Sequence, residues 1–97
     1  MQSVLQSTAK FETIPGIGPN LAQDLRMLGF ADPADLRGQN PERMFEDLCQ
    51  LRGQRVDRCV LYAFRCAVYF TSNESHDAQL LKWWNWKDRT LEPASLD

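Results

Sequence analysis

The residues best suited to bind a ligand lie in the stretch Ile14–Ala22, where two glycines are separated by one residue. Glycine accommodates the positive φ angles of tight turns. Pro19 suits the first turn of a helix, because its missing N–H group would have no partner there. Backbone N–H groups around Gly16 and Gly18 would then point out of the turn together. Such groups at a helix N-terminus bind anions, so the stretch predicts a phosphate-binding turn between two helices.

An alternative interpretation is a tight turn that only joins two packed helices, and two glycines alone would favour it. The surrounding apolar residues make the pattern more specific, because they would anchor the turn and begin a helical stripe. These residues are Ile14, Ile17, Leu21, Ala22 and Leu25.

The stretch resembles the helix-hairpin-helix motif, which binds DNA backbones without reading the base sequence. The positions that agree with the motif are Ile14, Pro15, Gly16, Ile17, Gly18 and Ala22. Asn20 differs, because DNA-binding members of the motif usually carry a lysine there. The resemblance therefore implies a neutral hydrogen bond to phosphate in place of a charge-assisted bond, which would be about twice as strong. It leaves open a monovalent cation in the turn.

Length and composition indicate one soluble globular domain. The chain has 97 residues, of which 43% are apolar and 25% charged, enough for a single modest core. No apolar run approaches the ~18 residues of a membrane span, and the N-terminus lacks a signal pattern, so we expect a cytoplasmic protein. The formal net charge of −2 argues against a surface that binds nucleic acid throughout, but allows a local basic face.

The residues that could bind metal or perform catalysis form no recognisable site. Cys49, Cys59 and Cys66 contain no CxxC pair, whereas structural zinc sites typically use closely spaced ligand pairs, so free thiols are expected. His76 is flanked by polar residues that fit a helix start better than a catalytic group. We therefore expect no metal, no organic cofactor and no enzymatic activity.

Apolar spacing and capping residues predict an all-α fold, a compact bundle of about five short helices. The expected helices cover about residues 2–13, 19–28, 41–52, 55–72 and 76–84, the last with Ser75 as N-cap, and a single helical turn follows Asp32-Pro33. Gly29 is expected to end 19–28, with Phe30 folding back after it. The segment 36–41 has the outline of a second, degenerate hairpin turn that lacks the second glycine, and we assign it no phosphate.

Helical spacing also predicts which side chains face the core. It places Asp24 on the exposed side of 19–28 and Leu51 on the apolar face of 41–52. The segment 55–72 is apolar over more than half of its surface, so it belongs in the middle of a bundle. The single domain then covers 1–89. Its parts are a hairpin unit at about 3–29, the second unit and long helix at about 32–72, and a Trp-rich segment at 75–88, followed by a frayed tail at 90–97.

Within 55–72, arginines and tyrosines gather on about a quarter of the helix circumference. These residues are Arg55, Arg58, Tyr62, Arg65 and Tyr69. Arginines beside aromatic rings can hold phosphates and stack on bases. They can equally pair with carboxylates such as Asp57, Glu46 or Asp47, while their stems cover apolar surface.

Trp83, Trp84 and Trp86 occupy three of four successive positions, and no single helix face can bury all of them. An exposed indole would serve as a partner anchor or a base-stacking platform. The alternative is a C-terminal lid whose indoles close a small core.

Taken whole, the chain resembles a small bacterial family, the pathogenicity-locus proteins, sometimes labelled mitomycin-resistance-type, which carry a helix-hairpin-helix domain. The resemblance covers about residues 10–88 and rests on Ile14–Pro19, Asp24-Leu25, Leu28-Gly29, Asp35-Leu36, Asp57–Tyr69 and Trp83–Asp88. It implies an all-α, SAM-domain-like hairpin fold and says little about activity.

Our leading hypothesis is a non-enzymatic, sequence-independent DNA-backbone-binding module. The residues expected to hold or approach a phosphate are Pro15, Gly16, Ile17, Gly18 and Asn20, with Arg58, Arg65 and Lys10 adding charge if the fold brings them near. Binding should be weak and strongly salt-dependent, because only a few phosphates would be neutralised. The alternative is a protein-interaction module that uses Trp83, Trp84 and Trp86, or a flank of the long helix.

Overall fold

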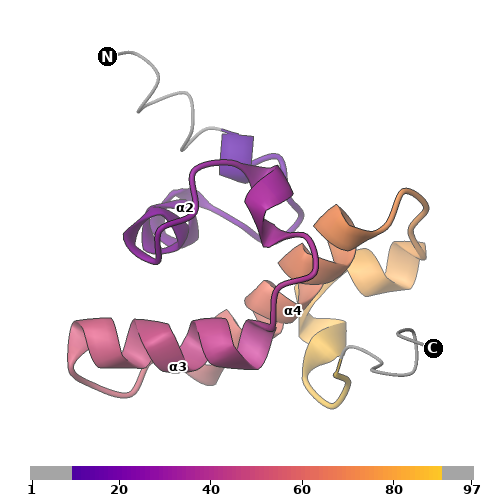
Figure 1. The fold of residues 1–97 in the computed structure, drawn as a ribbon. Coiled ribbons are helices and arrows are strands. Elements are labelled where there is room, and N and C mark those ends of the chain that lie inside the picture. Colours follow the sequence, from indigo (N-terminus) through magenta and orange to yellow (C-terminus); the bar gives the residue numbers. More distant parts are fainter. Residues whose placement is uncertain (1–9, 91–97) are drawn as a thin grey trace.

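In the computed structural model, residues 10–90 are described, and every regular element among them is helical (Figure 1). The α-helices are α2 (Pro19–Met27), α3 (Pro41–Arg52) and α4 (Arg58–Ser72). Short 3₁₀ turns complete the fold: η1 (Pro33–Leu36), η2 (Ala78–Leu81) and η3 (Trp83–Trp86). The all-α prediction is confirmed for this part of the chain. Lys10 and Phe11 are helical, and the rest of the helix expected at 2–13 lies mainly outside the described residues.

The helix boundaries follow the capping residues in the sequence. Asn40 Oδ1 accepts hydrogen bonds from the N–H groups of Glu42 and Arg43 at 2.9 and 3.2 Å, which starts α3. Gly29 has φ +101° after α2, and Phe30 N donates to Leu25 O at 3.1 Å, so the predicted glycine cap is confirmed.

The C-terminal region differs from the prediction of one helix over 76–84. Asp77, and not Ser75, caps the first element there, and its carboxylate accepts a hydrogen bond from Gln79 N at 2.9 Å. Two successive 3₁₀ turns then follow in place of an α-helix. Both 3₁₀ turns pack against α4. Such turns are common as short connecting segments.

The core is built around α4, which packs against α3 and all three 3₁₀ turns. Seven of its residues are buried, namely Leu61 and the run from Ala63 to Val68. The same buried cluster includes apolar residues from the N-terminal turn, α2, η1 and α3, all at most 4% exposed: Phe11, Ile14, Ile17, Leu25, Leu36, Phe45 and Leu48. The prediction of a central helix is confirmed, but the helix begins at Arg58 and not at 55, because Asp57 caps it by accepting from Cys59 N, so Arg55 and Val56 precede the helix.

Two side-chain placements differ from the helical-wheel prediction. Asp24 is only 5% exposed, and its carboxylate receives a hydrogen bond from the Arg52 guanidinium. This ion pair joins α2 to the last turn of α3, a partner that the spacing within α2 could not reveal. Leu51 is 55% exposed, because the C-terminal end of α3 lies at the edge of the molecule (Figure 1). None of the helices within residues 10–90 has the length and apolar character needed to cross a membrane.

The contrast between Leu48 and Leu51 provides a stability test. We expect Leu48→Ala to lower the free energy of unfolding by about 2–5 kcal/mol, because it removes a fully buried side chain. Leu51→Ala should change it by less than about 0.5 kcal/mol, because that side chain is already largely in water. Urea titrations followed by circular dichroism would measure both. Equal losses would show that Leu51 is covered in solution.

Candidate nucleic-acid interface

The turn before α2 is held in a defined shape by its apolar anchors. Ile17 N donates to Ile14 O at 3.1 Å, and Gly16, at the third position of this turn, has φ +86°. A turn with positive φ at that position requires glycine or asparagine. Ile14 and Ile17 are 1% and 4% exposed, so both ends of the turn are fixed to the core.

Gly18 serves a different purpose from Gly16. Its backbone is extended, with φ −96° and ψ −171°, so the expectation that both glycines adopt tight-turn angles holds only for Gly16. A Cβ added at Gly18 would meet no atom within 4 Å. Gly18 is the N-cap of α2 but provides no side-chain acceptor for the helix. Within residues 10–90, nothing accepts a hydrogen bond from the N–H groups of Asn20 or Leu21.

The segment 36–41 repeats this turn. Gln39 N donates to Leu36 O at 3.1 Å, and Gly38 has φ +72°. Asn40 then precedes Pro41 just as Gly18 precedes Pro19, and each proline opens an α-helix. The two turns therefore share a hydrogen bond and a glycine with positive φ, but the residue before the proline differs, with ψ −171° at Gly18 and 108° at Asn40.

The two turns differ in what their N–H groups bind. In the second, Asn40 Oδ1 accepts from the first turn of α3, and Gly38 N donates to Ser72 Oγ at 2.9 Å. The corresponding N–H groups of the first turn belong to Asn20, Leu21 and Gly16, and they have no acceptor among the described residues. Gly16, Gly18 and Asn20 are exposed. Of these two turns, only the first presents unpaired donors to a ligand.

Residues of α4 and η3 contact the first turn. The Cys66 thiol of α4 lies 3.8 Å from Pro15 O and 3.5 Å from Leu80 O. Burial raises the pKa of this thiol from 9.0 to about 11, so it stays protonated and able to donate. Trp83 lies against Gly16, where an added Cβ would come within 3.2 Å of the indole. Gly16 is therefore required both by its φ angle and by this close contact.

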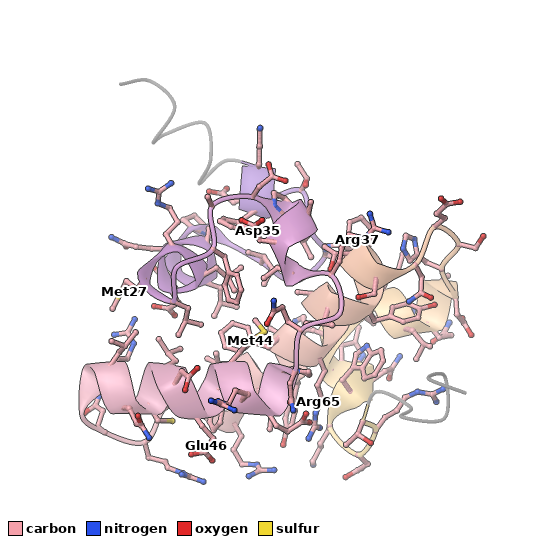
Figure 2. All side chains as sticks on the ribbon, viewed as in Figure 1. Met27, Asp35, Arg37, Met44, Glu46 and Arg65 are labelled. Atoms are coloured by element: carbon pink, nitrogen blue, oxygen red, sulfur yellow. The ribbon has the colours of Figure 1, made fainter. Side chains whose placement is uncertain are left out.

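Arg65, predicted to add charge to a DNA-binding surface, is in the interior. It is 7% exposed, its Nε donates to Glu42 at 2.8 Å, and its Nη1 donates to Trp86 O at 2.8 Å. Figure 2 shows it beside the start of α3. The alternative of pairing with a carboxylate is the one realised, although the carboxylate belongs to Glu42. Both donating nitrogens are engaged within the fold, so Arg65 does not offer them to a phosphate.

Arg58 and Lys10 remain at the surface. Arg58 lies with Arg55 in a groove of about 230 Å³ whose other lining residues are Glu42, Phe45, Glu46, Leu61 and Arg65. None of the turn residues lines this groove, and its glutamates offset the two exposed arginines. Lys10 Nζ lies 3.4 Å from Asp32 Oδ1, with both side chains exposed. Such an exposed ion pair contributes little to stability.

The three tryptophans have three different environments. Trp86 is 2% exposed, its Nε1 donates to Leu80 O at 2.8 Å, and its ring contacts Tyr69. Trp83 is half-buried against the core, and Trp84 is 55% exposed. The lid interpretation therefore describes Trp86 and Trp83. Among the tryptophans, a partner-binding role is left to Trp84.

The remaining candidate residues serve the fold. His76 Nε2 lies 2.7 Å from Phe70 O, and its ring stacks on Phe70 with centroids 4.7 Å apart. The cysteines are free thiols, as expected, and only Cys59 is exposed. Between residues 10 and 90 there is no cluster of three or more His, Cys, Asp or Glu residues arranged to hold a metal ion.

Within residues 10–90, these features define a helical fold in which the uncapped turn before α2 is braced by an aromatic C-terminal segment. Comparison with known sequences identifies the family. The chain belongs to the pathogenicity locus family (Cdd1), which matches residues 5–91. A mitomycin resistance protein, McrB of Streptomyces lavendulae, is 26% identical over 74 residues, which cover 76% of this chain and 67% of that protein. No solved structure matches.

The buried thiol beneath the turn makes stability depend on alkaline pH. The unfolded chain loses the Cys66 proton near pH 9, whereas the folded protein retains it until about pH 11. Stability contributed by the neutral thiol is therefore complete below pH 9 and is lost as the pH rises to about 11. Urea unfolding at about pH 8 and pH 10.5 should show a larger loss for the wild type than for Cys66→Ala. The Cys66→Ala variant controls for pH effects elsewhere in the chain, so equal losses would mean that water reaches the thiol.

Proposed function

We propose that this protein is a non-enzymatic module that binds nucleic-acid backbones, independently of sequence, through the turn before α2. The observation that supports this most is the difference between its two similar turns. The second turn has its N–H groups bound by Asn40 and Ser72, whereas the first turn has glycine at the capping position. With glycine there, the N–H groups of Asn20 and Leu21 have no acceptor among the described residues, and an anion can accept from such groups at a helix start.

A phosphate at this turn would accept hydrogen bonds from the N–H groups of Asn20 and Leu21. The positive end of the α2 dipole would favour its charge. The Asn20 side chain could donate one further neutral bond, and Lys10 lies in the segment that leads into the turn. With so few charges engaged, affinity should be weak, and its salt dependence should correspond to about one unit of slope per phosphate neutralised.

The direct test is a fluorescence anisotropy titration with labelled duplex and single-stranded oligonucleotides at low and moderate salt. Binding at low salt that weakens as salt rises, without dependence on base sequence, is the expected result. No binding to either form at low salt would refute the proposed function.

The second turn suggests a variant that closes the first. In Gly18→Asn, the new side chain should cap α2 as Asn40 caps α3, and so occupy the N–H groups offered to phosphate. We expect the fold to be kept, and oligonucleotide affinity to fall about ten-fold or more, the value of losing a hydrogen bond to a charged group.

Gly18→Ala is the matched control, since its Cβ has space and its φ is permitted, but it brings no acceptor. Gly18→Ala should weaken binding less than Gly18→Asn does, because its methyl group only reduces the space open to a phosphate at the turn. If neither variant changes affinity while both stay folded, the turn is not the binding site.

Restoring the charge that the turn lacks should strengthen binding. Asn20 is exposed in the first turn of α2, so Asn20→Lys places an ammonium group where a charge-assisted bond to phosphate can form. We expect tighter binding and a salt slope steeper by about one unit. Gln50→Lys adds the same charge on the exposed side of α3 and should change affinity less. Equal gains from both variants would point to a general charge effect and not to a site at the turn.

A further inference from the structure

The exposed indole of Trp84 is held beside the open turn. Trp83 lies against Gly16, and the Trp83 and Trp84 rings meet edge to face with centroids 5.7 Å apart. The position of this pair is fixed because η3 is bound at its other end, where Trp86 donates to Leu80 O and accepts from Arg65. Trp84 nevertheless remains 55% exposed. The ring of Trp83 therefore contacts Gly16 of the turn on one hand and the exposed ring of Trp84 on the other.

The sequence segment that contains Trp84 is basic, although the chain as a whole is acidic. Residues 82–89 carry Lys82, Lys87 and Arg89 against the single acid Asp88, whereas the whole chain has 11 basic and 13 acidic residues. Both lysines are exposed, as is the neighbouring Asn85.

The indole also stands apart from other exposed apolar side chains. In the described part of the chain, the other large exposed apolar residues are Met27 and Leu51, at the ends of α2 and α3. A protein-binding surface usually presents several apolar side chains together. One ring among cations and amides fits a nucleobase with its flanking phosphates better than it fits an apolar peptide.

We propose that Trp84 is a stacking platform for an unpaired base, and that the ligand of this surface is single-stranded nucleic acid. This inference rests on the proposed function, since it places the backbone of the same strand at the turn. In a duplex, both faces of each internal base are covered by neighbouring base pairs, so an indole beside the backbone has nothing to stack on. A single strand can turn one base onto Trp84 while a neighbouring phosphate reaches the N–H groups of α2.

The test compares three labelled probes of equal length by fluorescence anisotropy at low salt: single-stranded oligothymidylate, the same backbone with abasic sites, and a duplex. The wild type should bind oligothymidylate most tightly. Trp84→Leu, which keeps an apolar side chain but removes the flat ring, should weaken oligothymidylate binding about ten-fold and leave abasic binding unchanged. Trp84→Tyr should retain most of the affinity. Thermal unfolding would verify that the variants are folded, as expected for an exposed position.

The outcomes separate this inference from the proposed function. If all three probes bind the wild type equally, or if Trp84→Leu binds oligothymidylate as well as the wild type does, base stacking is refuted. The effect of Gly18→Asn would still report on the turn. If Trp84→Leu weakens abasic and oligothymidylate binding alike, the ring does not act on bases, and the inference is again refuted. If no probe binds, both proposals fail together.

Discussion

The buried guanidinium of Arg65 links three elements of this small fold, α3, α4 and η3, through hydrogen bonds. One of its nitrogens binds Glu42 on α3, another binds the carbonyl of Trp86, and the residue itself belongs to α4. A charge placed this deep is tolerated only when it is paired and hydrogen-bonded, which Arg65 achieves on two sides. Its bond to Trp86 O also helps to hold the C-terminal turns, which contain no α-helix.

That linkage extends to the candidate binding surface. Trp86 is held by Arg65 and by its own bond to Leu80 O, which positions η3 and so places Trp83 on Gly16. The Cys66 thiol of α4 lies within hydrogen-bonding distance of Pro15 O in the turn and of Leu80 O in η2. The open turn is thus supported by residues far away in the sequence, while its outer N–H groups stay exposed. A rigid turn loses little conformational entropy on binding, which suits a site with few contacts.

Much of the fold could be predicted from the sequence because its signals are local. Caps at Asp32 and Asn40, the glycine stop at Gly29 and the central position of α4 depend on residues within one or two turns of each other. The turn at Ile14–Ala22 was predictable for the same reason, since φ preference and the missing N–H of proline act within the turn itself. These signals determined that the chain is helical and where its open turn lies.

The tertiary structure alone decided which side chains remain available for a ligand. Arg58 and Arg65 have the same chemistry and were predicted to share one helix face. Packing nevertheless buries Arg65 against Glu42 and leaves Arg58 exposed. Packing likewise buries Trp86 and leaves Trp84 exposed. Asp24 was predicted to be exposed, but it is buried and paired with Arg52 of another helix. Burial depends on contacts between distant segments, and helical periodicity describes only the helix itself. The sequence by itself determined the turn, and packing determined its surroundings.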